Sequence, residues 1–124
     1  MSKILVLDND QSNADAIQAV LEDQYFEVLS IIRSDDLVNS IKSFKPDLIV
    51  MDILLDNSDG RMLCNAIKHD HETRDIPVLL ITAMLETQAE KLPSLAEGII
   101  FKPVDYDKLY HKVSHLIAQQ LTHK

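Results

Sequence analysis

Short apolar runs alternate along this chain with segments in which apolar residues recur every three or four positions. The runs are mostly continuous instead of alternating with polar residues, which is typical of strands buried on both faces of a sheet. We therefore predict five buried strands, at residues 4–7, 27–32, 48–51, 78–81 and 99–101.

The segments between the runs have helical spacing. Ser34 precedes the second apolar stripe and is predicted to be its N-cap. Pro93 removes a backbone donor, so we expect an irregular fourth helix within residues 87–97. The predicted stripes are Ala16, Ile17, Val20, Leu21; Leu37, Val38, Ile41, Phe44; Met62, Leu63, Ala66, Ile67; and Leu109, Val113, Leu116, Ile117.

The order strand then helix, repeated five times, predicts right-handed crossovers and a parallel sheet between two helix layers. The expected fold class is α/β, a doubly wound five-stranded parallel sheet of the flavodoxin-like type. With 124 residues and no repeat, linker or composition shift, residues 1–124 are expected to form a single domain. The sequence stops a few residues after the last stripe, and we expect no second domain here.

The amino-acid composition excludes several classes of protein. Hydrophobic residues make up 46% of the chain and only two residues are glycine, which excludes disordered and collagen-like chains. The apolar runs are far shorter than a bilayer span, and Lys3 precedes the first run too closely for a secretory signal, so a cytoplasmic protein without a membrane association is expected. Cys64, the only cysteine, is predicted to be an inert buried thiol.

The net charge of the chain indicates which kinds of binding partner to expect. A formal net charge of -8 would repel a phosphate backbone, so direct binding to nucleic acid is not expected. A divalent cation or a cationic partner surface is the more natural counterpart.

Polar residues follow four of the predicted strands. They are Asp8-Asn9-Asp10, Asp52, Thr82-Ala83 and Lys102-Pro103. A single aspartate after a strand is commonly a turn former or a helix cap. The carboxyl ends of parallel strands, however, meet at one edge of the sheet, and clustered carboxylates repel one another unless a cation offsets their charge. A metal site that consists of oxygen donors and includes only a few carboxylates favours Mg²⁺.

The motifs KILVLDND, DLIVMDILLDNSDG, LLITA and FKPVD, in this order, resemble the receiver domain of two-component response regulators, the chemotaxis-regulator-like family. The resemblance covers essentially the whole chain. It implies that Asp52 accepts a phosphoryl group from a sensor histidine kinase or a histidine phosphotransfer protein, and that the domain then switches conformation to signal to a downstream protein. It also implies a monomer or weak homodimer that is not a turnover enzyme.

The resemblance assigns the site residues. Asp8 (through water), Asn9, Asp52 and the backbone carbonyl of Leu54 would hold Mg²⁺. The Thr82 hydroxyl, the Ala83 amide and the Lys102 ammonium would bind the phosphoryl oxygens, and a cis peptide bond is expected between Lys102 and Pro103.

Five positions call for separate expectations. Asn9 replaces the second acid of the family pattern, so we expect weakened Mg²⁺ binding, partly rescued by the neighbouring Asp10. Ile99 replaces an aromatic switching residue, and Asp56 replaces a proline and is expected to loosen its loop. Leu54 offers no hydrogen-bonding side chain to an attacking water, which predicts slow self-dephosphorylation. Gly60 is expected to adopt a positive φ.

Two other functions fit part of the pattern. One is a degenerate receiver that binds partners without phosphorylation, suggested by Asn9 and Ile99. The other is a phosphatase of the haloacid-dehalogenase type with Asp8 as nucleophile and Asp10 as acid/base; that family needs an acidic pair after the lysine strand, where only Asp105 and Asp107 remain.

Overall fold

Five strands make up the sheet of the computed structural model, which describes residues 1–122. The strands are β1 (Lys3–Leu7), β2 (Glu27–Ile31), β3 (Leu48–Asp52), β4 (Val78–Thr82) and β5 (Gly98–Phe101). Each lies within one residue of the predicted run at either end, so the strand positions are confirmed. The burial is not confirmed for β2 and β5, which form the two edges of the sheet and are only partly buried.

The helices are α1 (Gln11–Asp23), α2 (Leu37–Phe44), α3 (Gly60–His69), α4 (Glu86–Ala89) and α5 (Tyr106–Thr122), with a 3₁₀ turn η1 (Ser34–Asp36) before α2. The helix α4 is a single turn that ends four residues before Pro93, and the chain then runs without helix to β5. The prediction of an irregular fourth helix is therefore confirmed. Within residues 1–122, no helix is both long enough and apolar enough to span a membrane.

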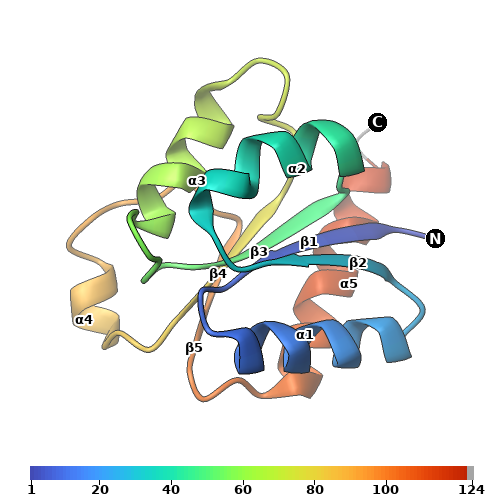
Figure 1. The fold of residues 1–124 in the computed structure, drawn as a ribbon, viewed down its shortest axis with the longest axis horizontal. Coiled ribbons are helices and arrows are strands. Elements are labelled where there is room, and N and C mark those ends of the chain that lie inside the picture. The colour runs from blue at the N-terminus through green and yellow to red at the C-terminus, as the bar shows by residue number, and fades with distance from the viewer. Residues whose placement is uncertain (123–124) are drawn as a thin grey trace.

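The strand order is β2-β1-β3-β4-β5, and every neighbouring pair is parallel. Helices α1 and α5 cover one face of the sheet, and α2 and α3 cover the other (Figure 1). This is the predicted doubly wound fold. The direction of strand addition reverses between β1 and β3, so the carboxyl ends of these two strands flank the switch point where such sheets bind ligands.

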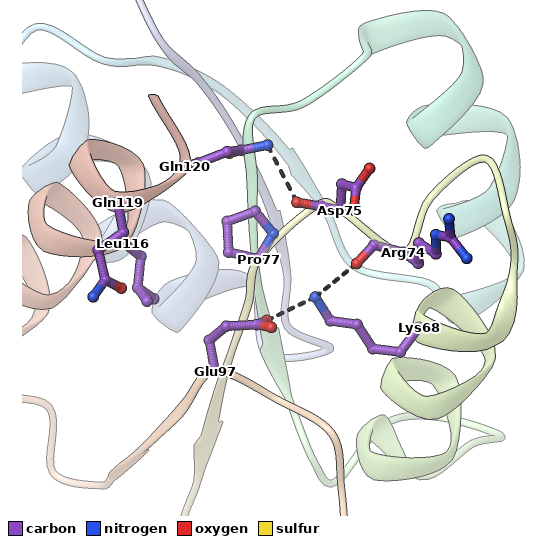
Figure 2. Close-up of a pocket in the computed structure, with 8 residues that line it drawn as sticks. All are labelled: Lys68, Arg74, Asp75, Pro77, Glu97, Leu116, Gln119 and Gln120. Atoms are coloured by element: carbon purple, nitrogen blue, oxygen red, sulfur yellow. Dashed lines mark hydrogen bonds and ion pairs between the residues drawn. The ribbon is translucent and has the colours of Figure 1, made fainter. Parts of the chain in front are cut away.

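The amino edge of the sheet, opposite the switch point, contains a pocket of about 480 Å³ (Figure 2). Lys68 of α3 lies in it almost fully buried. Its ammonium donates to the carbonyls of Arg74 (3.3 Å) and Ile76 (2.6 Å) and pairs with the Glu97 carboxylate at 2.8 Å. Glu97 also accepts the backbone N–H of Val78 at 2.7 Å. This network ties α3 to the starts of β4 and β5.

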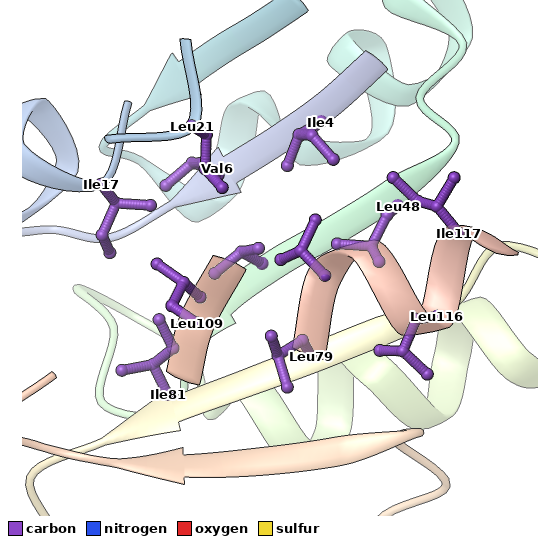
Figure 3. Close-up of a cluster of buried hydrophobic side chains, with 12 residues drawn as sticks. Ile4, Val6, Ile17, Leu21, Leu48, Leu79, Ile81, Leu109, Leu116 and Ile117 are labelled. Atoms are coloured by element: carbon purple, nitrogen blue, oxygen red, sulfur yellow. The ribbon is translucent and has the colours of Figure 1, made fainter. Parts of the chain in front are cut away.

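Two hydrophobic cores lie on the two faces of the sheet, because successive side chains of a strand point in opposite directions. Along β1, Ile4 and Val6 pack with α1 and α5, whereas Leu5 and Leu7 pack with α2 and α3. All four are fully buried, which explains the continuous apolar runs of the sequence. Figure 3 shows the first core, where Ile17 and Leu21 of α1 and Leu109, Leu116 and Ile117 of α5 meet the sheet.

Four residues of the predicted cap and stripes are placed differently: Ser34, Val38, Met62 and Ala66, which is exposed. Ser34 is not an N-cap: it begins η1, and neither η1 nor α2 has a side-chain cap. Its backbone N–H donates instead to Asp56 (3.2 Å), and its hydroxyl accepts from Ser58 (3.4 Å), because the loop after β3 packs against this turn. Val38 and Met62 are 60% and 55% exposed, since periodicity alone does not fix where a helix stripe stops.

Candidate functional site: an acidic pocket at the carboxyl edge of the sheet

Lys102 joins two carboxylates from different strands. Its Nζ lies 2.8 Å from Oδ2 of Asp52 and 3.3 Å from Oδ2 of Asp8. Both aspartates are buried, with 2% of Asp8 and 5% of Asp52 exposed. The expected convergence of polar residues at this edge is therefore found for these three side chains.

The strands place the two acids side by side. Leu7 of β1 pairs with Met51 of β3, so the next residues, Asp8 and Asp52, lie at neighbouring strand ends. Each carboxylate is oriented by a backbone donor two residues further on. Oδ1 of Asp8 accepts the N–H of Asp10 at 2.9 Å, and Oδ1 of Asp52 accepts the N–H of Leu54 at 3.1 Å.

Lys102 follows β5 and is held by the backbone. Its N–H donates to the carbonyl of Thr82 at 2.7 Å, and its peptide bond to Pro103 is cis, as expected. The ammonium thus reaches the pocket from the side of β4 and β5, facing the acids of β1 and β3.

The charges of the pocket are not balanced. Burial raises the pKa of Asp8 above its ordinary value, and the neighbouring Asp52 acts in the same direction. Burial alone would lower the pKa of Lys102, but its hydrogen bond and charge interaction with Asp52, together with Asp8, raise it. One ammonium against two carboxylates leaves a net negative charge, which favours a further cation.

Thr82 and Ala83 end β4 in the same region. Thr82 is fully buried, and its Oγ1 accepts the N–H of Met84 at 3.0 Å. Ala83 is exposed. The Thr82 hydroxyl therefore orients the start of the loop that leads to α4, and the Ala83 backbone lies at the surface beside the pocket.

The remaining predicted ligands are exposed residues that follow β1 and β3. Asn9 is exposed directly after Asp8, and the side chain of Leu54 is exposed while its N–H binds Asp52. Asp10 also has a structural role. Its Oδ1 accepts the N–H of Asn13 at 3.1 Å and so caps α1, because a side chain at this position can satisfy a free helix donor.

Gly60 is needed for a reason other than the predicted one, since its φ is not positive. A Cβ at this position would overlap the carbonyl oxygen of Asp52 and lie 2.9 Å from Cα of Ile53. The N–H of Gly60 donates to the carbonyl of Ile53 at 2.8 Å. The glycine thus lets α3 begin directly against the backbone of the proposed phosphoacceptor.

Asp56 has a hydrogen-bond partner that the sequence did not predict. It accepts the backbone N–H of Ser34, and this hydrogen bond lowers the pKa of the Asp56 carboxyl. The contact joins the loop after β3 to the turn after β2. The predicted loosening relative to a proline stays a prediction, since it did not consider what a carboxylate can bind.

The pocket fits Mg²⁺ by the chemistry of its donors. Within residues 1–122, no group of three or more His, Cys, Asp and Glu side chains is arranged to hold a metal ion. Mg²⁺ commonly uses one or two carboxylates and completes its shell with water and substrate oxygens. Asp8 and Asp52, the Asn9 amide and the Leu54 carbonyl supply oxygen donors of this kind.

Asp59 and Arg61 are site neighbours that the sequence reasoning missed. Asp59 caps α3 through the N–H of Arg61 at 2.8 Å, and Arg61 is 6% exposed despite its charge. The Asp-Gly at the start of the third helical stripe was a usable signal for a cap. Nothing in the periodicity indicated a buried arginine.

The fold and the acidic edge of the sheet place the chain in a known class of proteins. The strand order and the acids at the switch point define an open α/β domain of the flavodoxin-like class with a ligand site at its carboxyl edge. The family model of the response regulator receiver domain matches residues 4–114, and the chain belongs to this family. This is a family of signalling domains, not of classical enzymes, and the phosphatase and degenerate-receiver alternatives are not favoured.

Individual relatives agree with this assignment. The response regulator PleD of Caulobacter vibrioides is 31% identical over 123 residues, which cover 97% of this chain and 27% of PleD. Protein PilH of Pseudomonas aeruginosa is 27% identical, with 95% of this chain and 99% of PilH covered. The signal receiver domain of a histidine kinase from Syntrophus aciditrophicus superposes with a TM-score of 0.88 at 26% identity, covering 96% of this chain and 92% of that one.

Proposed function

We propose that this receiver accepts a phosphoryl group on Asp52 from the histidine of a sensor kinase or of a histidine phosphotransfer protein. A carboxylate oxygen of Asp52 forms a bond to phosphorus as the bond between phosphorus and the histidine nitrogen breaks. The electron pair of that bond stays on the imidazole nitrogen, and the product is an acyl phosphate.

The observation that carries this proposal is the double contact of Lys102 with Asp8 and Asp52. An ammonium held between two buried carboxylates is already positioned to neutralise a third anionic group. Phosphoryl transfer depends mainly on positioning and on neutralising charge on the phosphoryl oxygens. Lys102 would move from its Asp52 contact to a phosphoryl oxygen as the acceptor loses its free carboxylate.

The other residues have positioning roles. The Leu54 N–H orients one oxygen of Asp52. The Thr82 hydroxyl and the Ala83 N–H are the proposed donors to the remaining phosphoryl oxygens, and Thr82 would exchange its present bond to Met84 for this one.

Magnesium is the proposed cofactor, held by Asp8 through water, by Asn9 and Asp52, and by the Leu54 carbonyl. When bound, it supplies a dication that neutralises the phosphoryl oxygens and the acceptor carboxylate together. The net negative charge of the pocket and the all-oxygen donor set support this choice.

The signal would leave the domain by a shift between conformers. A phosphoryl group favours only the conformer with which it makes better contacts, and a move of Thr82 toward it would draw the loop before α4. Residues 1–124 are proposed to act as one receiver domain that contacts a kinase or phosphotransfer protein and a downstream protein, without being a turnover enzyme. A cytoplasmic location is part of the proposal, and the free, buried thiol of Cys64 is compatible with a reducing compartment.

Mass spectrometry after incubation with Mg²⁺ and acetyl phosphate tests the acceptor. We expect a mass increase of one phosphoryl group that Asp52→Asn abolishes and that EDTA prevents. Asp56→Asn is the matched control, because it removes another carboxylate of the same loop and should leave labelling intact. Wild-type protein that gains no phosphoryl group would contradict the proposal, and labelling that depends on Asp8 with continuous turnover of an aryl phosphate would favour a phosphatase.

A further inference from the structure

Arg61 is a buried cation outside the acidic pocket. Its Nε and Nη2 donate to Oδ1 and Oδ2 of Asp59 at 3.0 and 2.6 Å, a two-point ion pair. Its Nη1 donates to the carbonyls of Gln88 (3.3 Å) and Ala89 (3.1 Å). One guanidinium therefore connects the start of α3 with the end of α4.

The Asp59 end of this connection is fixed to the proposed phosphoacceptor. Gly60, the next residue, packs its Cα against the carbonyl of Asp52 and donates its N–H to Ile53. Leu54 and Asp59 form an antiparallel bridge across the loop. Main-chain contacts therefore link the backbone of Asp52 to Asp59.

The other end holds a segment with little regular structure of its own, residues 86–95, which we name the α4 segment. Arg61 binds the last carbonyls of its single helical turn, where a short helix leaves acceptor capacity free; the Gln88 carbonyl also accepts the N–H of Lys91 at 3.3 Å. Asn65, one turn further along α3, donates to the carbonyl of Pro93 (3.2 Å) and accepts the N–H of Leu95 (2.9 Å). Arg61 and Asn65 thus dock the α4 segment on one face of α3.

Of Arg61 and Asn65, Arg61 depends more strongly on its hydrogen-bond partners, because it is charged. A buried guanidinium is stable only while its donors are satisfied, so the ion pair to Asp59 and the bonds to α4 depend on each other. The hydrogen bond from Arg61 holds the pKa of Asp59 below its ordinary value. Loss of the ion pair with Asp59 would therefore change the free energy of the hydrogen bonds to α4, and loss of those bonds would change that of the ion pair.

We propose that Arg61 is a positioning residue that couples the loop carrying Asp52 to the α4 segment. This coupling rests on the proposed function, because the event to be transmitted is phosphorylation of Asp52. The docking of the α4 segment by Arg61 does not depend on phosphorylation and is measured separately.

Hydrogen exchange of the unphosphorylated protein tests the docking. Gln88, Ala89 and Glu90 donate their amides within the α4 turn, so their exchange reports on its opening. Arg61→Met should speed exchange of these amides about tenfold or more, because it removes two hydrogen bonds from a charged donor to the end of the turn. Lys68→Met is the matched control: it also removes a buried cation of α3 that binds carbonyls, but only at the amino edge. It should speed exchange at Val78 and leave the three α4 amides unchanged.

Exchange measured with Mg²⁺ and acetyl phosphate tests the coupling. In the wild-type protein, labelling of Asp52 should change the exchange rates of the three α4 amides at least about twofold. In Arg61→Met, Asp52 should still be labelled while that change is lost. Arg61→Lys keeps a cation without the planar fork, should retain wild-type protection of the strands, and should also lose the change.

The outcomes separate the two proposals. Wild-type protein that takes up no phosphoryl group overturns the proposed function. Labelling of wild type and both Arg61 variants with the same change at α4 overturns the coupling alone. Exchange at Gln88, Ala89 and Glu90 that Arg61→Met leaves unchanged, in the unphosphorylated protein, overturns the docking on which the coupling depends.

Discussion

The ammonium of Lys102 lies 2.8 Å from Asp52, although 50 positions separate the two residues in the chain. The contact exists because β3 and β5 flank β4 and end at the same edge of the sheet. It pairs the ammonium of Lys102 with the carboxylate of Asp52 before any ligand binds.

Replacing Lys102 by methionine should slow phosphorylation of Asp52 by acetyl phosphate about 100-fold, because removing one positioned donor to a developing charge typically has an effect of this size. Affinity for Mg²⁺ should not fall, since the pocket becomes more negative. Labelling rates by mass spectrometry and Mg²⁺ titration in the absence of phosphodonor measure the two effects. An unchanged labelling rate would remove Lys102 from the site.

Replacing Asn9 by aspartate should strengthen Mg²⁺ binding by about tenfold or more, because it adds a negative charge at the mouth of the pocket. Asp10→Asn is the control. Its carboxylate caps α1 and should contribute little to the metal, so that affinity should stay close to the wild-type value. Equal affinities of wild type and Asn9→Asp would show that the metal does not contact this position.

Most of the fold could be predicted because burial on both faces leaves a direct trace in the sequence. Leu5 and Val6 face opposite cores, so neither face of β1 can be polar. The convergence of Asp8, Asp52 and Lys102 also followed from topology, since parallel strands bring their carboxyl ends to one edge.

What could not be predicted depends on loop geometry. Asp56 binds the backbone of Ser34 through a single side-chain contact, and such a contact leaves no periodic signal. Arg61 was missed for a related reason: apolar periodicity assigns charged residues to the solvent face. Its burial becomes intelligible only once the short α4 is known to place the carbonyls of Gln88 and Ala89 within reach of the guanidinium.

Replacing Leu54 by asparagine should speed loss of the phosphoryl group, because a polar side chain at this exposed position can orient an attacking water. Met62→Asn is the control, since Met62 is a similarly exposed apolar residue on α3. Decay of purified phosphoprotein, followed by mass spectrometry, measures the rate. A Leu54→Asn protein that decays no faster than wild type would separate this side chain from the reacting water.

Replacing Gly60 by alanine should destabilise the fold by about 2–4 kcal/mol, because the new Cβ meets the backbone of β3, which cannot yield without moving Asp52. Gly98→Ala is the matched control. There the new Cβ lies 2.7 Å from Cε of Lys112 and 3.2 Å from a methyl group of Leu79, and a flexible lysine can move aside. Urea unfolding should rank Gly60→Ala well below Gly98→Ala, and the reverse order would contradict the close contact with Asp52.

The ion pair of Asp59 predicts a specific acid dependence of stability. The side-chain hydrogen bond from Arg61 lowers the pKa of Asp59, so between that lowered value and the ordinary value of about 3.9 the unfolded chain binds more protons than the folded one. Stability contributed by this carboxylate is complete above that range and is lost as the pH falls through it. Asp59→Ser keeps a capping oxygen but removes the charge, and should flatten the fall in unfolding free energy below about pH 4. Arg61→Met should flatten it equally, and the double variant no further, because the two side chains form one pair; additive effects in urea titrations between pH 2.5 and 6 would show that the two groups act independently.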